Sequence, residues 1–120
     1  MADAGLSSFD PAEAMRQVGD DPAVLREIME LFIQEAAKLE GELRQGLERR
    51  DAKFLERAAH SIKGSCSVFG ATATREAAHR LEQLGRAGSL EGAAEALAQL
   101  SKETARLTLD LKRFLNAGPA

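Results

Sequence analysis

Apolar residues recur every three or four positions through most of this chain, a spacing that gathers them on one face of an α-helix. The longest such series steps three, four, three, four without a break through Leu90, Ala93, Leu97, Leu100, Thr104, Leu107, Leu111 and Phe114. Alternating runs of β-branched or aromatic residues, which mark strands, are missing from the sequence. These patterns predict an all-α fold.

Cap signals divide the chain into five predicted helices. Asp10 and Pro11 begin a short first helix, in which Glu13 can complete a capping box, and Gly19 ends it. Four longer helices are expected over about 22–49, 51–70 and 72–85, and from Ser89 onward. Long amphipathic helices with short connections pack as antiparallel neighbours. We therefore predict an antiparallel up-and-down four-helix bundle with a short additional N-terminal helix.

The bundle is expected to form a single domain over residues 9–116, between a flexible lead-in over 1–8 and a C-terminal tail over 117–120. A dimeric coiled coil through the last helix is the alternative. Fewer than four heptads, beside three other amphipathic helices, favour packing within one chain. We therefore expect a monomer.

Length, charge and composition argue against several classes of function. A chain of 120 residues with a net charge of −3 has room for one small domain and no general attraction to nucleic acid. No apolar run approaches the roughly 20 residues that span a bilayer, and the start MADAGLSS has no secretory signal. We expect no membrane partner and a cytoplasmic location, and the single cysteine, Cys66, suits a reducing compartment. A phosphate-cradling glycine loop, a nucleotide site and a magnesium-binding carboxylate cluster are missing, so no kinase active site is expected.

The third predicted helix carries a histidine on its outer face. At 100° per residue, with Leu55 set at zero, His60 lies at about 140°, Gly64 at about 180°, Ser67 at about 120° and Lys63 at about 80°. The predicted core residues fall within about 60° of zero, and they are Leu55, Ala58, Ala59, Ile62, Cys66 and Phe69. His60 is therefore expected to face away from the core.

The two residues one turn beyond His60 give this face a possible chemistry. Gly64 leaves bare helix backbone beside the imidazole, so another macromolecule can come close to a ring nitrogen. Lys63 places a positive charge where phosphoryl oxygens would sit, which is the electrostatic help that phosphoryl transfer needs. The alternative is a solvated helix face on which these residue types are incidental.

The stretch from His60 to Cys66, HSIKGSC, followed by Gly70 and Ala71, resembles the signature of histidine-containing phosphotransfer (HPt) domains. The later stretch HRLEQLGRAGSLE, residues 79–91, resembles the fourth helix and turn of that family. The resemblance implies a helical bundle that relays a phosphoryl group between receiver-domain aspartates, or from a sensor or hybrid histidine kinase. It implies no cofactor of the domain's own, because the receiver supplies magnesium.

The resemblance also implies roles for individual residues. His60 is the phosphorylated nucleophile, Lys63 steadies the phosphoryl oxygens and Gly64 provides clearance for the receiver. Glu82 occupies the position of a residue that accepts a hydrogen bond from the inner ring nitrogen, although a solvated helix carboxylate is an equal alternative. Three further residues are expected on the partner-binding surface, and they are Arg57, Ser67 and Arg86.

The sequence departs from the family pattern at Cys66, Thr74 and Ala77, which puts the packing of the fourth helix in doubt. A metal site is not expected, because His60 and His79 lack the i,i+4 pairing of helical zinc sites. Two alternatives to the relay remain: a docking module that is not phosphorylated, and the phosphorylated domain of a chemotaxis-type kinase, which the pair His79 and Glu82 also resembles.

Overall fold

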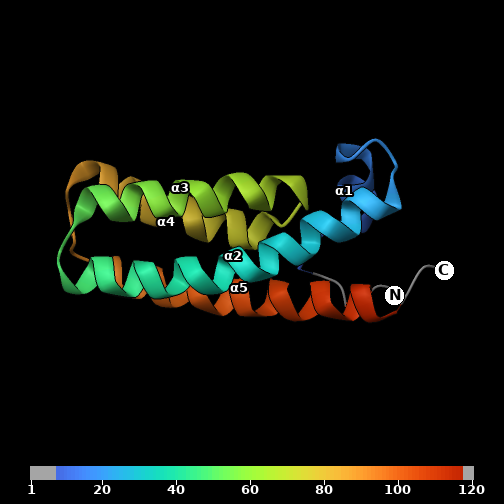
Figure 1. Ribbon diagram of the computed structural model, residues 1–120. Helices are drawn as coiled ribbons and strands as arrows, with labels where there is room; N and C mark the ends of the chain where they lie inside the picture. Colours follow the sequence, from blue (N-terminus) through green and yellow to red (C-terminus); the bar gives the residue numbers. More distant parts are fainter. Residues whose placement is uncertain (1–7, 118–120) are drawn as a thin grey trace.

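The computed structural model describes residues 8–117, and all regular structure within them is helical. The five helices are α1 (Pro11–Gln17), α2 (Pro22–Glu48), α3 (Ala52–Val68), α4 (Thr72–Ala87) and α5 (Ala93–Asn116). Helices α2 to α5 run up and down side by side, and α1 lies across the end where α2 begins (Figure 1). The predicted all-α bundle with a short N-terminal helix is confirmed.

Aspartates begin the first three helices, as the sequence predicts. Asp10, Asp21 and Asp51 each accept hydrogen bonds from backbone N–H groups of the first turn, which otherwise have no partner in the helix. Only half of the predicted capping box of α1 forms, because the Asp10 side chain accepts from the Glu13 N–H but the Glu13 side chain does not accept from the Asp10 N–H. The Glu13 carboxylate accepts hydrogen bonds from Arg16 and Gln17, while the Asp10 N–H donates to the Phe69 carbonyl, 2.9 Å away. The Asp10 N–H is therefore bonded to the end of α3 and is not available to the Glu13 carboxylate.

The connection between α4 and α5 differs from the prediction. Helix α4 continues through Gly85 to Ala87, and α5 begins at Ala93 instead of Ser89. Gly88 and Gly92 both have positive φ, +71° and +81°, and they enclose a turn that a continuing helix cannot make. Gly85 has a packing role, because a Cβ there would lie 2.7 Å from the Ala52 carbonyl oxygen on α3.

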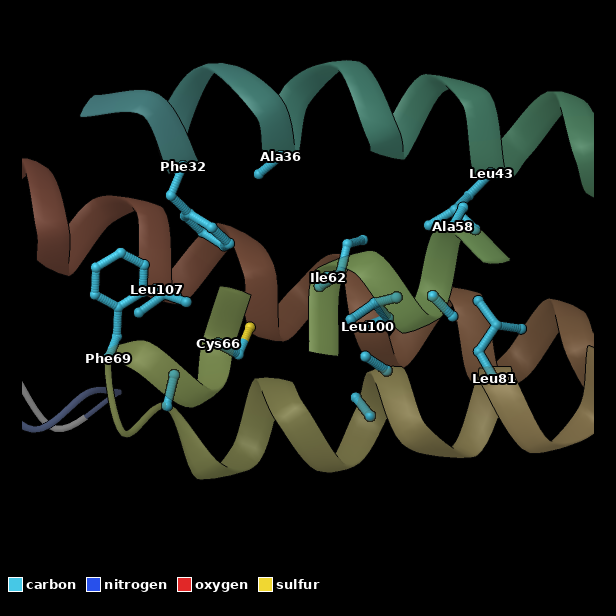
Figure 2. Close-up of a cluster of buried hydrophobic side chains, with 14 of the residues drawn as sticks. Phe32, Ala36, Leu43, Ala58, Ile62, Cys66, Phe69, Leu81, Leu100 and Leu107 are labelled. Carbon is cyan, nitrogen blue, oxygen red and sulfur yellow. The ribbon is translucent and has the colours of Figure 1, made fainter. Parts of the chain in front are cut away.

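One apolar face of each long helix forms the core (Figure 2). The six residues predicted to be the core face of α3 are all buried, from Leu55 to Phe69. Residues of α3 and α4 that depart from the family pattern are accommodated inside the same core. Cys66 and Thr74 are fully buried, and the Thr74 hydroxyl donates to the Glu103 carbonyl on α5, 3.2 Å away. The outward direction of His60 therefore follows from a well-packed inner face.

The ends of the chain were expected to be flexible, and most of those residues, 1–7 and 118–120, lie outside the described residues. Ser8 is an exception to the predicted lead-in, because it is buried and both its N–H and its hydroxyl donate to the Asp110 carboxylate on α5. Within residues 8–117, no helix combines the length and the apolar character that crossing a membrane requires.

Candidate functional site

His60 stands on the outer face of α3, at the line where α3 meets α4. Its side chain is 67% exposed, and its Nδ1 lies 2.8 Å from Oε2 of Glu82. The histidine belongs to α3 and the carboxylate to α4, so the contact joins two helices. The ring is thus open to solvent on one side and held by a hydrogen bond on the other.

Glu82 is a buried carboxylate at the centre of four basic side chains. Only 1% of it is exposed, so it is not the solvated helix carboxylate of the alternative interpretation. Lys63 Nζ lies 2.7 Å from Oε1 and His79 Nδ1 lies 3.6 Å from the same oxygen. Arg86 Nη2 lies 3.1 Å from Oε2, the oxygen that contacts His60.

These neighbours keep Glu82 ionised. The Lys63 ammonium and the His60 ring together outweigh the opposing effect of burial and lower the pKa of Glu82 to about 2. An ionised carboxylate can only accept hydrogen bonds, so His60 must donate through an Nδ1–H group. In the neutral ring the lone pair then lies on Nε2. The contact therefore selects the tautomer in which the far nitrogen is nucleophilic.

Lys63 lies on the flank of α3, as the helix geometry predicts, but it is not free. Its side chain is 21% exposed, and its ammonium lies between Glu82 and His79, 3.4 Å from His79 Nδ1. The sequence suggested an ammonium available to phosphoryl oxygens, whereas the structure has it paired with the carboxylate. His79, which the sequence left as an ordinary exposed histidine, belongs to this cluster.

Gly64 is exposed one turn beyond His60, and a Cβ built on it would meet nothing within 4 Å. The fold itself therefore does not require glycine at this position. Gly85 provides the contrast, since a Cβ there would collide with the α3 backbone. Glycine at this open position makes α3 less stable than alanine would by about 1 kcal/mol. This cost fits a need for space outside the bundle.

The three residues expected on the partner-binding surface lie in different surroundings. Arg57 and Arg86 line one hollow between α3 and α4, together with Glu56, His60, Ser61 and Glu82. Ser67 lies nearly two turns from His60 on the same helix and turns its hydroxyl to the Lys63 carbonyl, 3.2 Å away. The structure thus brings Arg57 and Arg86 beside the imidazole and leaves Ser67 apart.

Sequence reasoning missed Glu56, whose Oε2 lies 3.1 Å from Arg86 Nε. No local pattern identifies this pair, because the residues are 30 positions apart on different helices. The spacing of Glu82 and Arg86, four residues apart, does predict a contact within α4. Among the residues that the structure describes, no group of three or more histidine, cysteine, aspartate or glutamate side chains could hold a metal ion.

Fold and site together define a helical-bundle domain that displays an oriented, solvent-open histidine on its side. The family model of the Hpt domain matches residues 27–114, which include all of α3 and α4. The chain belongs to the Hpt domain family and has that family's phosphorelay histidine phosphotransfer role. Proteins of this family work with kinases and receivers in two-component phosphorelays.

Two known proteins are similar to the chain. Histidine-containing phosphotransfer protein 4 of Arabidopsis thaliana is 29% identical over 107 residues, which cover 86% of this chain and 84% of that protein. The crystal structure of histidine-containing phosphotransfer protein B from Pseudomonas aeruginosa superposes with a TM-score of 0.86 and 22% identity. That match covers 93% of this chain and 97% of the other, so the two share their fold.

Proposed function

We propose that this protein carries its phosphoryl group on Nε2 of His60 and exchanges it with the active-site aspartates of receiver domains. The observation that supports this most is the 2.8 Å contact between His60 Nδ1 and a buried, ionised Glu82, on a ring that is 67% exposed. Orientation of one nitrogen and exposure of the ring are the two properties that a shared phosphoryl carrier needs.

Each transfer is a substitution at phosphorus, in which one bound group replaces another. The Nε2 lone pair attacks the phosphorus of a receiver's aspartyl phosphate, the N–P bond forms, and the bond from phosphorus to the aspartate oxygen breaks. The aspartate leaves as a carboxylate, and the Nδ1 proton stays on the ring. Positive charge develops on the imidazole, and Glu82 stabilises it because its carboxylate is already in hydrogen-bond contact. The reverse displacement returns the group to a receiver.

Lys63 and Gly64 support this transfer in different ways. Lys63 adds positive potential next to the ring, which favours the phosphoryl oxygens in the transition state and in the phosphohistidine. Gly64 leaves the approach to the ring open, so that a receiver can bring its phosphoryl group into line with Nε2. The open space that a Cβ at Gly64 would occupy, with nothing within 4 Å, supports the second role.

The remaining expectations complete the proposal. The domain is a carrier without a kinase site of its own, the receiver provides the magnesium ion, and Arg57 and Ser67 face the receiver. The protein acts as a monomer in the cytoplasm. The exposure of Arg57 and Ser67 on α3 supports their place on the receiver-facing surface, and the free thiol of Cys66 suits a reducing compartment.

Phosphoryl transfer to variants of the two neighbouring histidines tests the assignment. Incubation with a phosphorylated cognate receiver should give an acid-labile, alkali-stable adduct on the unchanged protein. His60→Gln should keep the fold and abolish the adduct, while the matched control His79→Gln should still be labelled. Persistent labelling of the His60→Gln protein would refute His60 as the carrier.

The space beside the ring is tested by Gly64→Gln. This variant should slow transfer from the receiver while leaving the bundle intact, because Gly64 is exposed and a Cβ there meets no atom within 4 Å. An unchanged transfer rate would remove the clearance role of Gly64.

A further inference from the structure

Arg86 is one of the more exposed side chains of the site, yet both ends of its guanidinium are occupied. Its side chain is 62% exposed, Nη2 lies 3.1 Å from Glu82 Oε2, and Nε lies 3.1 Å from Glu56 Oε2. Glu82 Oε2 is the same atom that accepts the His60 hydrogen bond at 2.8 Å. Arg86 and the imidazole therefore meet on one oxygen atom.

The backbone next to Arg86 explains why this bridge can form. Gly85 lies against α3, where a Cβ would be 2.7 Å from the Glu56 backbone nitrogen and 2.9 Å from its Cα. The two helices therefore approach each other closely beside Arg86 and Glu56. The side chain at the next position of α4, Arg86, reaches across to the Glu56 carboxylate on α3.

The shared oxygen gives Arg86 an effect on the ring. A lone carboxylate beside an imidazole favours addition of a second proton, and the resulting imidazolium has no lone pair on Nε2. A guanidinium on the same oxygen offsets that attraction, as Lys63 does on the other oxygen. A carboxylate fixed from two sides also keeps its oxygen directed at Nδ1.

The charged and titratable groups that face His60 come from two helices. Glu82 and Arg86 belong to α4, with His79 on the far side of the carboxylate, while α3 contributes Glu56, Arg57 and Lys63. Arg57 lines the same hollow as Arg86, but it makes no ion pair or hydrogen bond with another side chain among residues 8–117. Arg57 is therefore a natural control for the loss of one positive charge near the ring.

We propose that Arg86, held in place by Glu56, is a positioning residue that fixes the Glu82 carboxylate against Nδ1 of His60, and thereby keeps the ring proton on Nδ1 and Nε2 ready to accept a phosphoryl group. The proposal rests on the proposed function for its biological meaning. The state of the ring can be measured without any phosphoryl transfer. The interpretation of Arg86 as a residue that only contacts the partner does not predict any change in the free protein.

The first experiment measures the state of the His60 ring by ¹⁵N NMR of histidine-labelled protein at neutral pH. The readout is the ratio of neutral, Nδ1-protonated rings to all other forms. In Arg86→Ala this ratio should fall about fivefold, because that is the effect expected from the loss of one partly exposed charge-assisted hydrogen bond. Both variants are compared in roughly 1 M salt, where the Debye length is about 3 Å, and Arg57→Ala should leave the ratio unchanged. Equal ratios in the two variants would overturn the proposal.

A second variant tests the bridge itself. Glu56→Ala should lower the same ratio by a smaller factor, because Arg86 then loses one of its two anchors. In the double variant Glu56→Ala/Arg86→Ala, the removal of Glu56 should have no additional effect. Additive effects of the two substitutions would show that Glu56 does not act through Arg86. Helix content, measured by circular dichroism, verifies that each variant is folded.

Labelling by phosphoramidate separates positioning from docking, since this small donor needs no partner. The Nε2 lone pair attacks its phosphorus, the bond from phosphorus to nitrogen breaks, and ammonia leaves. Arg86→Ala should be labelled about fivefold more slowly than Arg57→Ala, in line with the change in ring state. Equal rates would count against the proposal. Failure of the proposed function would look different, because the unchanged protein would then form no receiver-dependent adduct on His60.

Discussion

Two glycines on neighbouring helices, Gly64 on α3 and Gly85 on α4, should respond in opposite directions to the same substitution. At Gly85 an added Cβ would lie 2.7 Å from the Ala52 carbonyl oxygen and 2.7 Å from the Glu56 nitrogen. Both neighbours are backbone atoms, so no side-chain rotation relieves the contact. At Gly64 an added Cβ would meet nothing within 4 Å.

The distances set the size of the effect. Ordinary van der Waals contact begins at 3.4 Å and the new Cβ would lie at 2.7 Å, so α3 and α4 must separate locally by about 0.7 Å to accept Gly85→Ala. Overpacking of this kind costs about 1–3 kcal/mol, and three backbone atoms within 3.0 Å place Gly85→Ala in the upper half of that range, about 2–3 kcal/mol, of which alanine returns about 1 kcal/mol as helix propensity. The expected net loss is about 1–2 kcal/mol, or about 4–8 °C in Tm for a domain of this size. Gly64→Ala should instead gain up to about 1 kcal/mol.

Thermal and urea unfolding of both variants, followed by circular dichroism, measures the difference. The His60 ring state provides a second readout, because separation of α3 from α4 lengthens the contact with Glu82 and should reduce the Nδ1-protonated form. A Gly85→Ala protein as stable as the unchanged one would refute the close-packing argument. A destabilised Gly64→Ala protein would show that this glycine has a role inside the fold.

Three further outcomes are expected. The pKa of Glu82 is lowered to about 2 from 4.5, so the ionised carboxylate stabilises the fold fully above pH 4.5, by up to about 3 kcal/mol, and this contribution disappears as the pH falls toward 2. In Glu82→Gln, the free energy of unfolding measured with urea between these pH values should depend much less on pH. An unaltered pH dependence would exclude Glu82 as the cause. Lys63→Ala should slow phosphoryl transfer or shorten the lifetime of the adduct. It should also lower the free energy of unfolding, measured with urea, by about 1–3 kcal/mol, because Glu82 Oε1 loses its ammonium partner. Normal transfer together with normal stability would leave the lysine without a role. Burial raises the pKa of the Cys66 thiol to about 12, so a thiol reagent at mildly alkaline pH should react only in step with unfolding, and rapid labelling of the native protein would contradict that burial.

Much of the fold could be predicted from the sequence because its signals are local. An aspartate caps the first turn of its own helix, and an apolar residue every third or fourth position defines a face. These two facts are enough to place Asp51 at the start of α3, its six core residues inside and His60 outside. The errors arose where a distant contact intervened, as when Phe69 took the N–H of Asp10 that the capping box needed.

The sequence by itself determined that His60, Lys63 and Gly64 share the outer part of one helix, because rotation about a helix axis depends only on residue number. Only the tertiary structure decided what those side chains meet. Glu82 could have been solvated, and it is instead buried between a histidine, a lysine and an arginine because α4 approaches α3 closely at Gly85. The separation and relative rotation of two helices result from the packing of the whole core, and no spacing within one helix encodes them.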